Sequence, residues 1–103
     1  MNVPYDQLFD FTKSILTAAG CSEHEARIST EVLLRADLRG VDSHGVARLS
    51  GYVRLIDKKR VNTTPEIKLI HETPSTGTID GDSGLGLVVG PEAMKLAIKK
   101  ATE

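Results

Sequence analysis

The sequence of 103 residues has few of the residue types that mark specialised classes of protein. It has no tryptophan and only 4% aromatic residues, so any hydrophobic core must consist of aliphatic side chains. Its single cysteine, Cys21, excludes an intrachain disulfide and fits a reducing compartment. Because no partner base is evident beside Cys21, we expect it to be a small packing residue rather than a reactive thiol.

The sequence also lacks a long apolar run and an excess of basic charge. No stretch is long and apolar enough to span a membrane, and no signal peptide opens the chain. The net charge is −1, whereas proteins that bind nucleic acid through its phosphates usually have a clear basic excess. The short basic run at 58–60 is typical of a solvated loop. We therefore expect a soluble cytoplasmic protein without a membrane or nucleic-acid partner.

Three amphipathic helical patterns occupy the first 60 residues. Their spacing predicts helices over about 4–19, 23–39 and 44–57. Ser22 and Glu25 form an S-x-x-E capping box, which makes the start of the second helix the clearest boundary in the chain. The apolar stripes of the first and third helices are Leu8, Phe11, Ile15, Leu16 and Ala19, and Val46, Leu49, Val53 and Ile56.

Beyond a polar linker at 57–66, the pattern changes to short strands. Ile67, Leu69 and Ile70 indicate one strand and Thr76–Asp80 another, followed by a flexible glycine-rich turn and a helix from near Pro91. The predicted fold class is mixed α/β. It has a helical subdomain over 1–60 and the beginning of a β-β-α domain over 61–103. Two strands and one helix cannot close a sheet around a good core, so the second domain looks incomplete.

The residues best suited to chemistry are Asp42-Ser43-His44-Gly45, followed by Arg48 and Tyr52. On a helix, His44, Arg48 and Tyr52 would share an arc of about 80°. Arginine can hold a carboxylate with two hydrogen bonds, and histidine can exchange a proton near neutral pH. We expect Asp42 or Ser43 to cap the helix, Gly45 to leave room for a ligand, and the helix N-terminus to favour an anion. From spacing alone, a solvated helix face is the alternative interpretation.

Other candidate sites are weak. Gly84, Gly86 and Gly90 miss the G-x-G-x-x-G dinucleotide pattern by one residue, and we expect them to shape a strand-to-helix turn. His24 and His71 are expected to be exposed. Because the histidines and the cysteine have no metal-like spacing, we predict no metal site.

Two stretches resemble a known family. The run from Leu34 to Leu49, with its D-S-H-G-x-x-R block, is similar to the signature of the malate/L-lactate/sulfolactate dehydrogenases. Ureidoglycolate dehydrogenase and the cyclic imino-acid reductases belong to the same family. A second stretch, Thr78–Gly86, agrees with it, and so do Asn62 and the segment Pro65–Ile67, while Leu87 stands where the family often has glutamine.

The resemblance implies a function and a set of site residues. These enzymes bind NAD or NADP in a non-Rossmann fold and transfer a hydride between nicotinamide and a 2-oxo or 2-hydroxy acid. By the resemblance, Ser43 and His44 line the catalytic and cofactor site, and Arg48 binds the substrate carboxylate, with Tyr52 as a weaker substrate contact. The resemblance also implies a homodimer. It places the proton-transferring histidine, a substrate-contacting lysine and most of the cofactor site after Glu103, so we expect this chain alone to be inactive.

Two other classes of function fit parts of the sequence. The helices over 23–39 and 44–57 with the intervening turn could form a DNA-binding helix-turn-helix, with Arg48 and Arg54 exposed. Alternatively, the chain is a non-catalytic dimerisation module whose exposed sheet edge, after residue 80, pairs with a partner strand. Binding to duplex DNA at low salt tests the first hypothesis, and the mass in solution tests the second.

Overall fold

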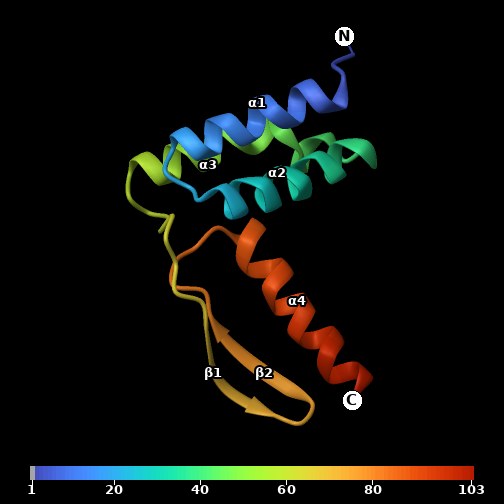
Figure 1. The fold of residues 1–103 in the computed structure, drawn as a ribbon, viewed down its shortest axis with the longest axis vertical. Coiled ribbons are helices and arrows are strands. Elements are labelled where there is room, and N and C mark those ends of the chain that lie inside the picture. Colours follow the sequence, from blue (N-terminus) through green and yellow to red (C-terminus); the bar gives the residue numbers. More distant parts are fainter. Residues whose placement is uncertain (1) are drawn as a thin grey trace.

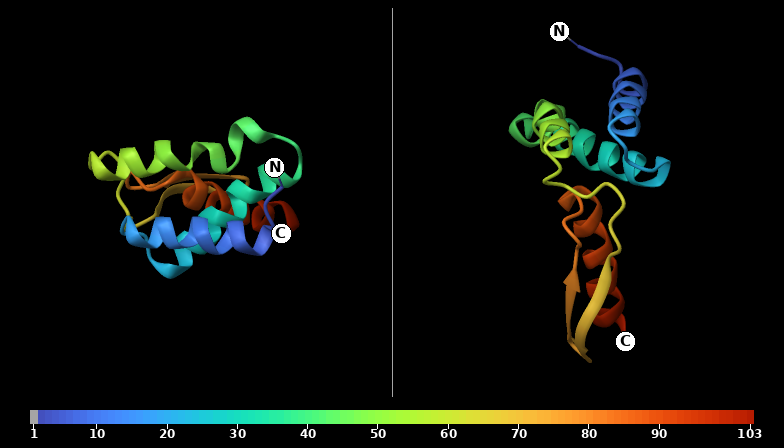
Figure 2. Two further views of the ribbon diagram at one scale, coloured as in Figure 1. Left: turned by 90° about the horizontal axis from the view of Figure 1, so that it is seen from above. Right: turned by 90° about the vertical axis from the view of Figure 1, so that its left-hand side faces the viewer.

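The computed structural model, which describes residues 2–103, consists of a helical layer and an arm that projects from it (Figure 1). The helical layer contains α1 (Tyr5–Ala18), α2 (Glu23–Leu38) and α3 (Leu49–Asp57). The arm contains an antiparallel hairpin of β1 (Lys68–Thr73) and β2 (Thr76–Asp80) beside α4 (Gly86–Thr102). The mixed α/β class is therefore confirmed. Helix α1 and the end of α4 lie at opposite ends of the long axis of the molecule (Figure 1; Figure 2, right).

The first helix has the predicted bounds to within one residue, but its buried face is turned away from Phe11. Phe11 is 61% exposed, whereas Thr12 and Leu16 are fully buried. The hydroxyl of Thr12 has no hydrogen-bond partner among the described residues. The prediction that Phe11 belongs to the buried face was therefore wrong: the more hydrophobic side chain is exposed, and the neighbouring position 12 is buried. The side chain four residues after Leu8 faces α2, and a small threonine fits there.

The second helix begins as predicted and forms the centre of the core. The Ser22 hydroxyl accepts a hydrogen bond of 3.1 Å from the Glu25 N–H, as expected for an N-cap. Its fully buried face is made of small and aliphatic side chains: Ala26, Ser29, Thr30, Leu33 and Leu34. Cys21 is buried and free, which confirms a packing role, and burial raises the pKa of its thiol.

The hairpin and its connecting turn confirm the predicted strands, with two changes of detail. β1 extends to Thr73, and the strand register shifts between Leu69 and His71, which forms a bulge. All six residues of β1 are exposed, His71 included, as expected for a two-stranded sheet.

The last helix begins at Gly86, five residues before the predicted start, and Pro91 lies inside it. The Val88 and Val89 N–H groups donate to the Leu85 carbonyl at 2.9 Å. Leu85 and Val88 are buried in the core formed by α2. Tertiary burial of these two side chains therefore outweighs the tendency of proline to mark the first turn. Leu87 packs against the same core and is half-buried.

A network around Asp82 joins the linker to the turn after β2. The Asp82 carboxylate accepts hydrogen bonds from the Asn62 side chain at 3.0 Å and from the Glu66 N–H at 2.9 Å. The Asn62 N–H donates to the Ser83 carbonyl at 2.9 Å. Asp82 and Ser83 have φ values of 52° and 58°, a conformation that these bonds stabilise. These contacts connect the turn to the linker at both Asn62 and Glu66.

The arm leaves much of its apolar surface uncovered. The accessible surface of 6995 Å² exceeds the roughly 5,700 Å² typical of a folded monomer of 11.1 kDa. The radius of gyration, 14.9 Å, exceeds the value of about 13 Å expected for this length. The most exposed apolar side chains of the arm are Leu69, Ile70, Met94 and Ile98.

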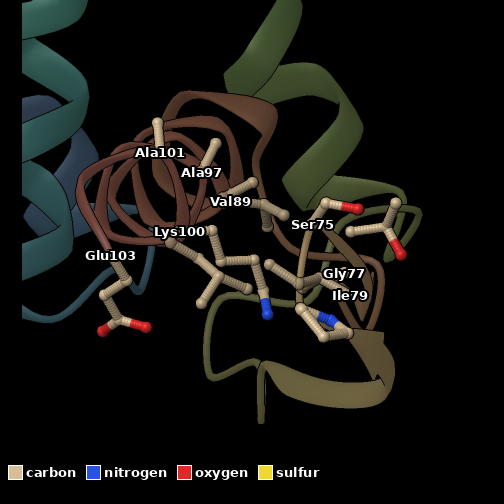
Figure 3. Close-up of a pocket in the computed structure, with 12 residues that line it drawn as sticks. Ser75, Gly77, Ile79, Val89, Ala97, Lys100, Ala101 and Glu103 are labelled. Carbon is tan, nitrogen blue, oxygen red and sulfur yellow. The ribbon is translucent and has the colours of Figure 1, made fainter.

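A groove of about 600 Å³ separates the hairpin from α4, and the Lys100 side chain lies across it (Figure 3). The Lys100 amine donates hydrogen bonds of 2.8 Å to the Glu72 carboxylate and the Thr73 carbonyl. These bonds tie the end of α4 to the tip of the hairpin. They also lower the pKa of Glu72, first through the hydrogen bond and then through the positive charge.

We predict that Asp82→Ala lowers the free energy of unfolding by about 1–2 kcal/mol, because two backbone segments lose a shared acceptor. Asp82→Asn keeps an oxygen acceptor and tolerates the positive φ, so its loss should be smaller. Urea denaturation followed by circular dichroism measures both variants. Equal stability of wild type and Asp82→Ala would contradict this role.

We predict that the Glu72–Lys100 pair contributes stability that depends on pH. A carboxyl group whose pKa is lowered by folding stabilises the fold above its ordinary pKa, and this contribution is lost as pH falls through the lowered pKa. Thermal unfolding of wild type and Glu72→Gln should therefore differ at neutral pH and converge in acid. Glu92→Gln, which removes an exposed pair with Lys95 of 3.8 Å, is the control and should show little difference at either pH.

Candidate active site

The segment that carries the candidate site is not the helical turn that the sequence predicts. It forms two short 3₁₀ turns, η1 (Asp42–His44) and η2 (Val46–Arg48), before α3 begins at Leu49. The prediction of a helix from residue 44 was therefore wrong. The expected dipole of an α-helix N-terminus at residues 43 and 44 is absent for the same reason.

The cap of this segment also differs from the prediction. Neither Asp42 nor Ser43 caps a helix with its side chain. Instead the carboxylate of Asp37, near the end of α2, accepts a hydrogen bond of 2.9 Å from the Val46 N–H. Gly45 is buried, and a β-carbon there would overlap the Asp37 carboxylate. The glycine thus admits a carboxylate of the same chain, rather than the ligand that the sequence suggested.

Ser43 connects the two chemical groups of the site. Its hydroxyl lies 2.8 Å from Nδ1 of His44, and its carbonyl accepts a 2.8 Å hydrogen bond from Nε of Arg48. When Nδ1 accepts the hydroxyl proton, the proton of a neutral imidazole is on Nε2, which is then a donor. The bond at Nε leaves both terminal amino groups of Arg48 available for a carboxylate.

A shallow groove of about 510 Å³ contains the predicted residues His44, Arg48 and Tyr52 together. The remaining lining residues are Gly51, Arg54 and Leu55. The sequence identified Arg54 only as a possible DNA contact and did not identify Asp37 at all. Residues six apart on a helix lie about 120° apart, so the spacing of Arg48 and Arg54 gave no signal for a shared groove. The contact of Asp37 depends on the turn between α2 and α3.

The groove contains two guanidinium groups whose positive charge no acidic side chain of residues 2–103 neutralises in an ion pair. Within residues 2–103, neither Arg48 nor Arg54 forms an ion pair, and both are exposed. Tyr52 is half-buried and also packs against the core, so it supports the groove from α3. This arrangement can bind a small anion and place an imidazole beside it.

The described residues contain neither a candidate metal site nor a candidate membrane-spanning helix. No cluster of three or more histidine, cysteine, aspartate or glutamate side chains in residues 2–103 is arranged to hold a metal ion. None of the helices within that range has the length and hydropathy to cross a membrane. His24 is exposed, as predicted, and so is the basic run at 58–60.

The connection between α2 and α3 does not favour a helix-turn-helix. Residues 39–48 separate the two helices, whereas the DNA-binding motif joins its helices by a turn of about three or four residues. The Asp37–Val46 contact and the two 3₁₀ turns occupy this longer connection. The glycine-rich segment after β2 leads into α4, which confirms a strand-to-helix turn.

Proteins similar to this chain in sequence and fold include malate and sulfolactate dehydrogenases. The malate dehydrogenase of Pyrococcus horikoshii is 52% identical over 103 residues, which are 100% of this chain and 29% of the relative. Its solved structure superposes with a TM-score of 0.95 at 53% identity, covering 99% of this chain and 29% of that one. The sequence model of the malate/L-lactate dehydrogenase family matches residues 3–103, and the chain belongs to this family.

Two further relatives carry other substrate names. The L-sulfolactate dehydrogenase of Methanocaldococcus jannaschii is 46% identical over 87 residues, which are 84% of this chain and 25% of the relative. A ureidoglycolate dehydrogenase (NAD(+)) of Escherichia coli is 32% identical over 103 residues, which are 100% of this chain and 30% of the relative. The chain therefore spans less than a third of the length of these relatives.

We predict that Gly45→Ala lowers the free energy of unfolding by about 2 kcal/mol or more, because the new methyl group must displace the Asp37 carboxylate or the segment itself. Gly51→Ala is the matched control. Nothing lies within 4 Å of a β-carbon at that helical position, so alanine should be neutral or stabilise α3 by up to about 1 kcal/mol. Denaturant unfolding of both variants measures the difference, and equal stabilities would contradict the close approach of Asp37.

Proposed function

We propose that this chain supplies the substrate-carboxylate part of the active site of an NAD(P)-dependent 2-hydroxyacid dehydrogenase. The observation that carries the proposal is the hydrogen bonding of the Arg48 guanidinium. Its Nε atom donates to the Ser43 carbonyl at 2.8 Å, while its terminal amino groups have no hydrogen-bond partner among residues 2–103 and lie in a groove shared with His44. This geometry suits a two-point contact with a carboxylate.

In this proposal, the remaining site residues orient the reacting groups. His44 lies against the 2-oxo or 2-hydroxyl oxygen and can donate a hydrogen bond from Nε2 while Ser43 holds Nδ1. Tyr52 forms part of the wall that confines the substrate. NAD or NADP supplies or accepts the hydride when it is bound. Ser43 and His44 are also the proposed cofactor contacts: the Ser43 hydroxyl oxygen can still accept a hydrogen bond from the carboxamide of a nicotinamide nucleotide, and the His44 ring lies beside it.

The second guanidinium favours a substrate with two negative groups. Arg54 lines the same groove as Arg48 and has no ion-pair partner in the described chain. One arginine can hold the carboxylate next to the reacting carbon, and the other can attract a second carboxylate or a sulfonate. Among malate, lactate, sulfolactate and ureidoglycolate, malate and sulfolactate fit this charge pattern best.

Several parts of the hypothesis rest on the family resemblance. These are the non-Rossmann cofactor domain and the homodimer, whereas the cytoplasmic location and the division into units at residues 60 and 61 are inferred from the composition and patterns of the sequence. The alternative of a dimerisation module draws support from the exposed residues of β1 and the uncovered apolar surface of the arm. Within the dehydrogenase hypothesis, the same surfaces are available for contact with the rest of an active enzyme.

The direct test is a hydride-transfer assay on the native gene product, whose mass is measured in the same preparation. Oxidation of NADH or NADPH at 340 nm is followed with oxaloacetate, pyruvate and sulfopyruvate. We expect turnover in a product several times heavier than 11.1 kDa. An inactive product of about 11.1 kDa would contradict the catalytic proposal and favour the dimerisation module.

We predict that Arg48→Ala raises the KM of the native enzyme for the 2-oxo acid by about 10–100-fold, because a charge-assisted contact with the carboxylate is lost. Arg35→Ala removes an exposed guanidinium from α2, outside the groove, and should leave KM unchanged. Initial rates over a range of 2-oxo acid concentrations measure both variants. Unchanged kinetics in Arg48→Ala would eliminate the carboxylate role.

A further inference from the structure

The segment 42–48 has few connections to the rest of the molecule. The bonds of Ser43 with His44 and Arg48 lie within the segment and do not orient it relative to the helical layer. Neither of its 3₁₀ turns has a side-chain cap of its own. Short 3₁₀ turns have weak hydrogen-bond geometry, so an outside contact has a large influence on their position.

Asp37 provides that outside contact. In the described chain, its carboxylate makes the one side-chain hydrogen bond that joins residues 42–48 to another element. The acceptor Oδ2 lies 2.9 Å from the Val46 nitrogen, in the middle of the segment. The backbone bond of 2.8 Å from the Val41 N–H to the Ala36 carbonyl holds the entry to the segment, and burial of Leu49 holds its exit.

Gly45 makes the approach of Asp37 possible. Gly45 is buried, and the space that a side chain would fill there is occupied by both carboxylate oxygens of Asp37. Val46 is half-buried and packs against the core beside this contact. The carboxylate therefore fixes the backbone two residues after His44 and two residues before Arg48.

We propose that Asp37 is a positioning residue for the active site: it sets the orientation of His44 and Arg48 by anchoring the Val46 backbone. Asp37 does not line the groove, so it acts through the segment rather than on the substrate. The inference deepens the proposed function and rests on it for the kinetic consequence. The structural consequence, a fixed environment of the His44 ring, can be measured independently of turnover.

The kinetic experiment compares Asp37→Ala with Asp37→Asn in the native enzyme. Asparagine keeps an oxygen acceptor of the same shape, whereas alanine removes the anchor. We expect kcat/KM to fall about 10–100-fold in Asp37→Ala, because small displacements of catalytic groups have effects of this size. Asp37→Asn should retain activity within about fivefold of wild type. The control Ser22→Ala removes the cap at the other end of α2 and should keep the wild-type kcat/KM.

The second readout is NMR of the imidazole rings in the 103-residue chain, which contains only three histidines. We expect the ring ¹⁵N shifts of His44 to change in Asp37→Ala and to return towards wild type in Asp37→Asn. His24 and His71 lie away from the segment and serve as internal references. Ser22→Ala should leave the ring of His44 unchanged.

The outcomes separate the two proposals. If wild type has no hydride-transfer activity but His44 responds to Asp37→Ala, the function is wrong and the positioning role stands. If wild type is active, and Asp37→Ala changes stability but neither His44 nor kcat/KM, Asp37 is only structural and the inference is overturned. Loss in Asp37→Asn equal to the loss in Asp37→Ala, with His44 unmoved in both, would overturn it as well.

Discussion

The fold depends on the burial of α2, which packs against α1, α4 and both 3₁₀ turns. The side chains of this contact face are small or aliphatic, as the near absence of aromatic residues requires. The buried face of α2 consists of the small residues Ala26, Ser29 and Thr30 and of Leu33 and Leu34, and α1 and α4 pack against this helix. Each fully buried leucine contributes about 1.5–3 kcal/mol, so the helical layer has its main source of stability in one helix.

The same helix carries the active-site segment. Its last turn contains Asp37, and the positive φ of Gly40, 78°, lets the chain turn immediately afterwards. The Val41 N–H then donates to the Ala36 carbonyl, and Asp37 reaches Val46. A core helix thus extends by short hydrogen bonds to the groups that we propose contact the substrate, in line with the use of rigid elements to position catalytic loops.

The arm has a different balance of forces. Its hairpin has no buried strand, and its attachment depends on polar contacts at both ends: Asn62 and Asp82 near the helical layer, and Lys100 with Glu72 at the tip. Surface contacts of this kind are individually weak. The exposed Ile70 and Met94 show that more apolar area is available for packing than this chain itself covers.

Much of the architecture could be predicted from the sequence, because it follows from local patterns. The cap of Ser22, the period of the first two helices, the strand Thr76–Asp80 and the apolar residues of α3 all depend on neighbours within a turn or a strand. The site residues Ser43, His44 and Arg48 were identified as a group by their family signature, and the structure brings His44 and Arg48 into one groove.

Tertiary structure alone decided how these elements are aligned. The start of α4 depends on burial of Val88, and the buried face of α1 depends on how closely Thr12 can approach α2. The arrangement of the site depends on a contact across nine residues, Asp37 to Val46, which replaces a regular helix by two 3₁₀ turns. Sequence periodicity indicates which face of a single helix or strand is apolar. These three features arise from contacts between elements, so periodicity could not predict them.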